Sequence, residues 1–284
     1  MLLDGKAVSL HIKENIKDKV LQLNYIYNSV PKLVVVQVGN NSASNVYIKN
    51  KLKAASFVGI DAELVHFDEN VTNEEMLNTI HRLNNDNNVD GIIVQLPLPS
   101  HLNETDIINE IDNSKDVDGF GLINKGKLFC GIDSLKSATP YGIMELLKYY
   151  NIELKGKHAV VVGRSNIVGK PMAIMLLNEN ATVSMCHSRT TNLKEMCLQA
   201  DILVSAVGKA KFITKDMVKK GAVVVDVGMN RDENGKLCGD VDFINVEDVA
   251  SYITPVPGGV GPLTIAMLLQ NTLNAYIARR GIKC

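Results

Sequence analysis

The sequence predicts an α/β protein of two domains, each built on a parallel sheet. Short apolar runs that fit strands alternate with helical patterns along the chain, which is typical of parallel strands joined by crossover helices. The 284 residues suggest roughly one to two domains of ~150 residues each. Hydrophobic residues make up 46% and charged residues 21% of the chain, which excludes a mainly disordered protein.

The first half contains three predicted strands. They are apolar runs bounded by Pro, Gly or Asp, at 32–38, 62–67 and 91–96. Helical patterns lie between them, at 44–58 and 73–84. Thr72 and Glu75 have the spacing of a capping box, which predicts the start of the second of these helices. A helix at 141–150, entered through Thr139-Pro140, is the predicted domain boundary.

The second half repeats the alternation at closer spacing. Its predicted strands are 158–162, 182–186, 202–207, 222–227 and 252–254, and its predicted helices are 169–179, 191–199 and 214–220. A final helix follows Pro262, whose fixed φ suits the first helical turn. We therefore expect a first domain at 1–140, a second at 141–261, and a C-terminal helix at 262–284 that packs back on the first.

Charge and composition argue against several classes of protein. The chain has 30 Lys+Arg and 31 Asp+Glu, so it lacks the excess of cations that binding to nucleic acid requires. No apolar run approaches the ~18 residues of a membrane span. The five cysteines include no CxxC pair, and the first residues carry no apolar signal core. We therefore expect a cytoplasmic protein with reduced thiols and no bound metal.

A glycine loop from Gly163 to Pro171 follows the predicted strand 158–162. A glycine turn between a strand and a helix lets backbone N–H groups face a phosphate. The loop is not a Walker A loop, because five residues separate Gly163 from Gly169. It is not a G-x-G-x-x-G turn either, because Ser165 takes the place of the second glycine. Dinucleotide binding and an ordinary strand–helix turn both remain open.

The end of the next predicted strand favours NADP over NAD. Domains that bind NAD usually place an acidic residue there to hold the ribose hydroxyls, whereas this chain has Cys186-His187-Ser188-Arg189-Thr190. Ser188 and Arg189, together with Arg164 of the glycine loop, could instead meet a phosphate on the ribose. An exposed polar strand end is the alternative interpretation.

Ser44, Tyr47 and Lys51 lie three and four residues apart on a helical pattern, so they share one face. The tyrosine ring could stack on a flat ligand, and a desolvated lysine could act as a base or polarise a substrate. The alternative is that Lys51 is a solvated charge like its neighbours Lys49 and Lys53.

Polar and glycine residues near other strand ends are further candidates. Gln95 precedes Leu96-Pro97 at the end of an apolar strand, where parallel sheets place their ligands. Asp116 and Asp118 fit a turn, a metal contact or a ligand anchor. The segment from Pro257 to Gly261 is a second glycine loop before a helix, either a ligand contact or a tight turn.

Together these segments resemble the bifunctional methylenetetrahydrofolate dehydrogenase/methenyltetrahydrofolate cyclohydrolase family, of the FolD type, over almost the whole chain. The motifs that carry the resemblance are Tyr47-x-x-x-Lys51, Val94 to Pro99, Lys115 to Gly119, Gly163 to Gly169, Cys186 to Thr190, Asp226 to Asn230, and Thr254 to Thr264. Two places depart from the family pattern. Ser137-Ala138 stand where Pro-Cys is usual, and Leu263 stands where Met is commoner.

The resemblance implies a catalytic domain and a Rossmann-like NADP-binding domain with a cleft between them, in a homodimer. It implies oxidation of 5,10-methylenetetrahydrofolate with NADP⁺, then hydrolysis to 10-formyltetrahydrofolate. Lys51 would be the catalytic lysine and Gln95 its partner, while Tyr47 would stack on the folate and Asp118 would bond the pterin. Other folate contacts would be Ser44, Leu96, Pro97, Pro257, Gly258, Gly259, Val260 and Gly261. NADP contacts would be Gly163, Arg164, Ser165, Ser188, Arg189 and Met229.

Two rival functions fit parts of the pattern. A two-domain NADP-dependent dehydrogenase of the shikimate dehydrogenase type would share the architecture, but it gives no reason for Tyr47, Lys51 and Gln95 to occur together. A non-catalytic NADP-binding sensor or scaffold gives no reason for the lysine.

Overall fold

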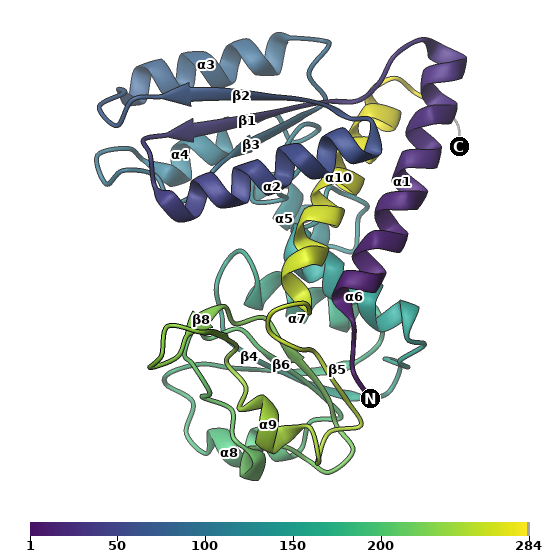
Figure 1. The fold of residues 1–284 in the computed structure, drawn as a ribbon, viewed down its shortest axis with the longest axis vertical. Helices are drawn as coiled ribbons and strands as arrows, with labels where there is room; N and C mark the ends of the chain where they lie inside the picture. Colours follow the sequence, from purple (N-terminus) through teal and green to yellow (C-terminus); the bar gives the residue numbers. More distant parts are fainter. Residues whose placement is uncertain (283–284) are drawn as a thin grey trace. The chain divides into compact units, whose positions relative to one another are not determined.

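The computed structural model describes residues 1–282, and Ala43 by its backbone alone (Figure 1). Contacts divide the chain into two compact units. Unit 1 comprises Met1–Ser9 and Thr139–Thr264, and unit 2 comprises Leu10–Ala138 and the chain from Ile265 onward. Each unit has its own parallel sheet, so the predicted two-domain α/β class is confirmed.

Unit 2 is built on three parallel strands in the order β2-β1-β3. They are β1 (Lys32–Val38), β2 (Asp61–Phe67) and β3 (Gly91–Val94). The central strand β1 is a nearly continuous apolar run because the sheet buries it on both faces. Val36 pairs with Val65 on one side and Val94 on the other, which brings the three carboxyl ends to one edge.

Helices surround this sheet. They are α2 (Ser42–Val58), α3 (Asn73–Asn85), α4 (Glu104–Asn109), α5 (Leu122–Phe129), and the larger parts of α1 (Gly5–Tyr27) and α10 (Val260–Arg279). Residues of α3 and α4 form one core cluster with Val34 and Val36 of β1. The predicted capping box is present, because Thr72 Oγ1 accepts from Glu75 N and Glu75 Oε2 accepts from Thr72 N.

Unit 1 contains five parallel strands in the order β10-β7-β6-β4-β5. They are β4 (His158–Val162), β5 (Thr182–Cys186), β6 (Ile202–Ser205), β7 (Val223–Asp226) and β10 (Tyr252–Ile253). The chain leaves β4 for β5 on one side and later returns to form β6 on the other. That reversal creates a switch point between β4 and β6, and the carboxyl ends of strands at such a point are where ligands bind.

The remaining elements of unit 1 lie around this sheet. They are α6 (Ala138–Tyr149), α7 (Gly169–Asn178), α8 (Leu193–Leu198), a 3₁₀ turn (Lys215–Met217), the hairpin of β8 (Asn230–Arg231) and β9 (Leu237–Cys238), and α9 (Phe243–Val246). The apolar core of this unit includes Val160, Leu203 and Val224 from neighbouring strands.

Several predicted boundaries were wrong. The helix expected at 214–220 is a 3₁₀ turn, because Thr214 Oγ1 bonds Asp216 Oδ1 and Val218 is extended. The strand expected at 91–96 ends at Val94, just before the proline-rich segment. The last helix begins at Val260 rather than after Pro262.

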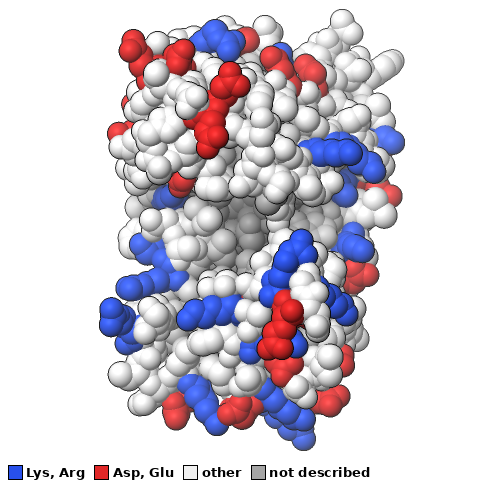
Figure 2. All heavy atoms as spheres, turned by 60° about the vertical axis from the view of Figure 1, so that its left-hand side comes forward, with Lys and Arg blue, Asp and Glu red and all other residues white. Residues whose placement is uncertain are grey.

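Charged side chains of both signs lie on the face of the molecule drawn in Figure 2, in keeping with a net charge of −1. Among residues 1–282, no helix combines the length and apolar character needed to cross a bilayer.

Candidate active site

Lys51 and Gln95 meet at the carboxyl edge of the sheet of unit 2. Lys51 lies on α2 and is 8% exposed, and its Nζ donates to Gln95 Oε1 at 3.1 Å. Gln95 follows β3 directly, and its Nε2 donates to the carbonyl of Leu96 at 2.7 Å. The side-chain amide therefore has a fixed orientation, with its oxygen toward the lysine.

The face of α2 that carries Lys51 also carries Ser44 and Tyr47. Ser44 is buried, whereas the Tyr47 side chain is 39% exposed. Burial of the ring raises the pKa of the Tyr47 phenol. Lys49 and Lys53 are exposed while Lys51 is buried, so Lys51 is not one of the solvated charges on this helix.

Asp118 lies in the loop between α4 and α5, close enough to Lys51 for their charges to interact. Burial raises the pKa of the Asp118 carboxyl, Lys51 opposes that rise, and Asp116 adds to it. The Asp116 carboxylate accepts hydrogen bonds from Phe120 N and Gly121 N, at 3.1 and 2.8 Å. Of the roles open to Asp116, the structure supports the turn.

The glycine loop of unit 1 has no space for side chains at two of its glycines. Gly163 adopts φ +130°, and a Cβ there would overlap the carbonyl oxygen of Ala206, which follows β6. A Cβ on Gly169 would overlap the Gly163 carbonyl. Ser165 Oγ accepts from Val168 N and Gly169 N, at 3.1 and 3.3 Å. The loop thus packs tightly at the switch point, where a dinucleotide would lie.

The end of β5 carries no carboxylate. A short turn follows Cys186, in which His187 N donates to Thr190 Oγ1 and Arg189 N donates to His187 Nδ1. Ser188 and Arg189 are exposed on this turn, and Arg164 is exposed on the glycine loop. Met229, after β7, is 52% exposed. The residues present fit an NADP ribose phosphate better than the free hydroxyls of NAD.

Sequence analysis assigned no role to two buried carboxylates beside these loops. Asp226 is 3% exposed and accepts from the backbone N–H groups of Gly228, Asp240 and Val241. Asp240 is fully buried and accepts from the N–H groups of Val207, Gly208 and Lys209 after β6. Together they hold the loops that follow β6 and β7. An Asp as the last residue of a buried apolar strand was the available signal for Asp226.

The segment from Pro257 to Gly261 belongs to unit 1, whereas Lys51, Gln95 and Asp118 belong to unit 2. Gly258 adopts φ +110°, and its carbonyl accepts from Lys6 N at 3.0 Å. A Cβ on Gly5 would overlap the Gly259 carbonyl, so the segment packs closely on the start of α1. Within residues 1–282 there is no group of three or more His, Cys, Asp or Glu that could hold a metal ion.

Two family models match the chain. They are described as the tetrahydrofolate dehydrogenase/cyclohydrolase catalytic domain, over residues 3–118, and the NAD(P)-binding domain of the same proteins, over residues 137–280. The bifunctional protein FolD of Streptococcus agalactiae serotype Ia is 53% identical over 276 residues, which are 97% of each chain.

Solved structures agree with these matches. The bifunctional FolD dehydrogenase/cyclohydrolase of Campylobacter jejuni has a TM-score of 0.96 and 51% identity, over 98% of this chain and 99% of that one. The Trypanosoma brucei enzyme, complexed with NADP cofactor and an inhibitor, has a TM-score of 0.94 and 36% identity, over 100% of this chain and 99% of that one. A shikimate dehydrogenase of Thermus thermophilus shares the fold alone. It is 14% identical, with a TM-score of 0.50 over 88% of this chain and 94% of that one.

Proposed function

Because the chain belongs to the tetrahydrofolate dehydrogenase/cyclohydrolase family, we propose that it oxidises 5,10-methylenetetrahydrofolate with NADP⁺ and hydrolyses the methenyl product to 10-formyltetrahydrofolate. The observation that carries this proposal is the hydrogen bond from the buried Lys51 to Gln95, beside Asp118. A shikimate dehydrogenase of Thermus thermophilus, by contrast, is only 14% identical to this chain.

We assign folate binding and catalysis to residues 1–140 with the C-terminal helix at 262–284, and NADP binding to 141–261. The family models at 3–118 and 137–280 support this division. So do the contacts that join the chain from Ile265 onward to Leu10–Ala138.

The oxidation requires the protein to position the two reactants, and no side chain has to transfer a proton. When bound, NADP⁺ accepts a hydride from the methylene carbon, and the two nitrogens on that carbon stabilise the cation that remains. Gly163, Ser165 and the backbone at Met229 hold the dinucleotide, while Arg164, Ser188 and Arg189 meet the ribose phosphate. Their work is to fix the distance and angle between the two reacting carbons.

The hydrolysis needs proton transfers, and Lys51 is the group placed to carry them. Gln95 holds Lys51 Nζ in one position through the 3.1 Å hydrogen bond. Asp118 bonds the pterin, and its carboxyl group lies near the lysine. Tyr47 stacks on the folate ring system from the next turn of α2. Ser44, Leu96 and Pro97, with the segment from Pro257 to Gly261, complete the folate contacts.

We also propose a homodimer that acts in the cytoplasm. The buried free thiols of Cys186 and Cys197 suit a reducing compartment. Sedimentation equilibrium on the purified protein tests the dimer, and fractionation of the source cells tests the compartment.

The first experiment supplies 5,10-methylenetetrahydrofolate with NADP⁺ or NAD⁺ to the purified protein. Reduced cofactor is followed by absorbance and the folates are separated by chromatography. We expect faster reduction of NADP⁺ than of NAD⁺, and 10-formyltetrahydrofolate as the end product. If methenyltetrahydrofolate is hydrolysed no faster with the protein than without it, the proposed role of Lys51 is rejected. Binding of NADP⁺ without turnover would point to a sensor.

A further inference from the structure

Asn271 is a polar side chain buried in an apolar part of α10. It is 1% exposed, and Leu268, Leu269 and Leu273 around it on the helix are buried as well. An amide in such a place destabilises the fold unless its hydrogen bonds are made. Both N–H bonds of Asn271 Nδ2 are used, one to the carbonyl of Val117 at 2.8 Å and one to the carbonyl of Lys136 at 2.7 Å.

These two carbonyls flank the turn at Asp118 and Gly119. Val117 directly precedes Asp118, and Gly119 turns the chain with φ +68°. A Cβ on Gly119 would lie 2.5 Å from the backbone of Lys136 and Ser137, so the turn packs directly against the backbone of these two residues. Asn271 therefore links the peptide between Val117 and Asp118 to the backbone at Lys136, against which the turn packs.

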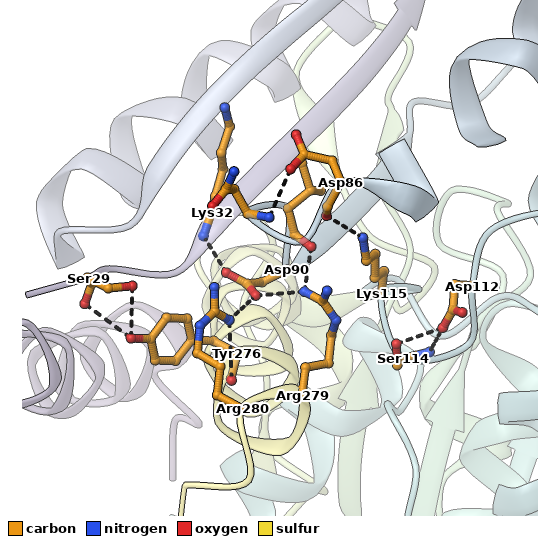
Figure 3. Close-up of polar contacts among 12 residues, drawn as sticks. Ser29, Lys32, Asp86, Asp90, Asp112, Ser114, Lys115, Tyr276, Arg279 and Arg280 are labelled. Carbon is orange, nitrogen blue, oxygen red and sulfur yellow. Dashed lines mark hydrogen bonds and ion pairs between the residues drawn. The ribbon is translucent and has the colours of Figure 1, made fainter. Parts of the chain in front are cut away.

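The rest of the loop is anchored on other elements. Lys115 Nζ donates to the carbonyls of Leu83, Asn84 and Asp86 at the end of α3, at 2.8, 2.7 and 2.7 Å; its contact with Asp86 is drawn in Figure 3. Asp116 holds the turn that follows. These bonds fix the two ends of the loop, and the Asn271 bond fixes the peptide between Val117 and Asp118.

We propose that Asn271 is a positioning residue that sets where the Asp118 carboxylate stands, and thereby controls the affinity for the folate substrate. The inference rests on the proposed function, in which Asp118 bonds the pterin. Asn271 touches neither substrate nor cofactor in this scheme and acts through the backbone of Asp118.

The test compares Asn271→Leu with Thr272→Val, its neighbour on α10. Thr272 is equally buried, but its hydroxyl bonds the Leu268 carbonyl within the helix. Both variants lose buried hydrogen bonds, and Asn271→Leu alone frees the Asp118 loop. We expect Asn271→Leu to raise the KM for methylenetetrahydrofolate on the order of tenfold, because it removes both hydrogen bonds that hold the peptide before Asp118. The KM for NADP⁺ should not change, and Thr272→Val should leave both constants unchanged.

A double-mutant cycle with Asp118→Asn separates positioning from general damage. If Asn271 acts through the carboxylate, Asn271→Leu adds little to the KM defect once Asp118 is replaced. Should Asn271→Leu not fold, Asn271→Ser, which keeps one donor, is measured in the same cycle. Equal folate KM for the Asn271 and Thr272 variants, or full additivity with Asp118→Asn, would overturn the inference. A wild-type protein without folate turnover would reject the proposed function instead.

Discussion

At the scale of single residues, Lys51 carries the most specific prediction. Lys51→Met keeps the length of the side chain but removes the amine that donates to Gln95. We expect cyclohydrolase activity to fall by ~10²–10⁴, the contribution typical of general acid–base catalysis, with part of the dehydrogenase activity retained. Hydrolysis of methenyltetrahydrofolate above the spontaneous rate measures the first, and NADP⁺ reduction the second.

The matched control is Lys53→Met, which makes the same change at an exposed position on the same helix. It should leave both activities at the wild-type level. Unchanged methenyl hydrolysis in the Lys51 variant, or equal losses in both variants, would contradict the role of Lys51.

Asp226 gives a prediction about pH and stability. Burial raises the pKa of its carboxyl to about 6, only partly opposed by hydrogen bonds from three backbone N–H groups. Because an unfolded Asp has a pKa of ~3.9, the native state binds this proton more tightly than the unfolded chain does. Protonation of Asp226 therefore stabilises the fold below pH ~4, and this stabilisation is lost as pH rises through about 6.

Asp226→Asn is neutral at every pH and lacks this dependence. The free energy of unfolding of this variant minus that of wild type should increase by about 1 kcal/mol between pH 5 and pH 8. Urea denaturation at the two pH values measures it. Asp216→Asn is the control, because hydrogen bonds from Lys194 and Thr214 lower the pKa of the Asp216 carboxyl to about 2. That group is ionised in both states above pH 5, so its difference from wild type should be flat. A flat difference for Asp226→Asn would contradict the raised pKa.

Sequence reasoning found the residues whose chemistry is unusual for their setting. Lys51 stood out by its spacing from Tyr47, and Gln95 by ending an apolar strand. It assigned nothing to Asp240 or Asn271, because each is a common residue whose partners are distant in the sequence. Asn271 bonds carbonyls 154 and 135 residues away. Pairings of that kind arise from tertiary packing, which no local pattern encodes.

At the scale of elements, strands with sharp boundaries were predicted well. The structure confirms β1, β4 and β5 with the predicted ends, because each is a short apolar run stopped by Pro, Gly or a polar turn. Helix α1 was not predicted, although it is the longest helix within residues 1–282. Its exposed Leu10, Leu21 and Ile26 interrupt the apolar stripe that signals an amphipathic helix.

The start of α7 supports a prediction about glycine. Replacing a helical glycine with alanine ordinarily stabilises a helix by ~0.5–1 kcal/mol. At Gly169 the new Cβ would overlap the Gly163 carbonyl, and backbone cannot move aside cheaply. We expect Gly169→Ala to destabilise the protein by ~1–3 kcal/mol and to weaken NADP⁺ binding. Urea denaturation and calorimetric titration with NADP⁺ measure the two effects.

Gly126 on α5 is the matched control, since a Cβ there meets nothing within 4 Å. Gly126→Ala should therefore show the ordinary gain of ~0.5–1 kcal/mol and unchanged NADP⁺ binding. A similar gain in both variants would mean that the glycine loop is not as tightly packed as the contacts of Gly163 and Gly169 indicate.

At the scale of the whole molecule, neither unit is a continuous stretch of chain. Met1–Ser9 belong with Thr139–Thr264, and the chain from Ile265 onward belongs with Leu10–Ala138. We expected the C-terminal helix to pack on the first domain, but no pattern in the sequence assigns Met1–Ser9 to the second sheet. The C-terminal end of α10 is fixed in unit 2 by ion pairs with one buried carboxylate. Arg279 and Arg280 both donate to the buried Asp90 carboxylate beside β3 (Figure 3).

This arrangement predicts that a chain ending at Thr264 loses the catalytic unit, although Lys51, Gln95 and Asp118 are all retained. The deletion removes five large buried side chains, Met267, Leu268, Leu269, Leu273 and Tyr276. At ~1.5–3 kcal/mol each, their burial is comparable to the whole net stability of ~5–15 kcal/mol of a typical domain. It also leaves Asp90 buried without its arginine partners, which is strongly destabilising.

Cyclohydrolase activity and the cooperative unfolding of unit 2 should both be lost, whereas a control chain ending at Ile282 should keep them. Methenyl hydrolysis and circular dichroism during urea denaturation measure the two outcomes, and an active chain of 264 residues would show that α10 is dispensable to the unit that holds Lys51.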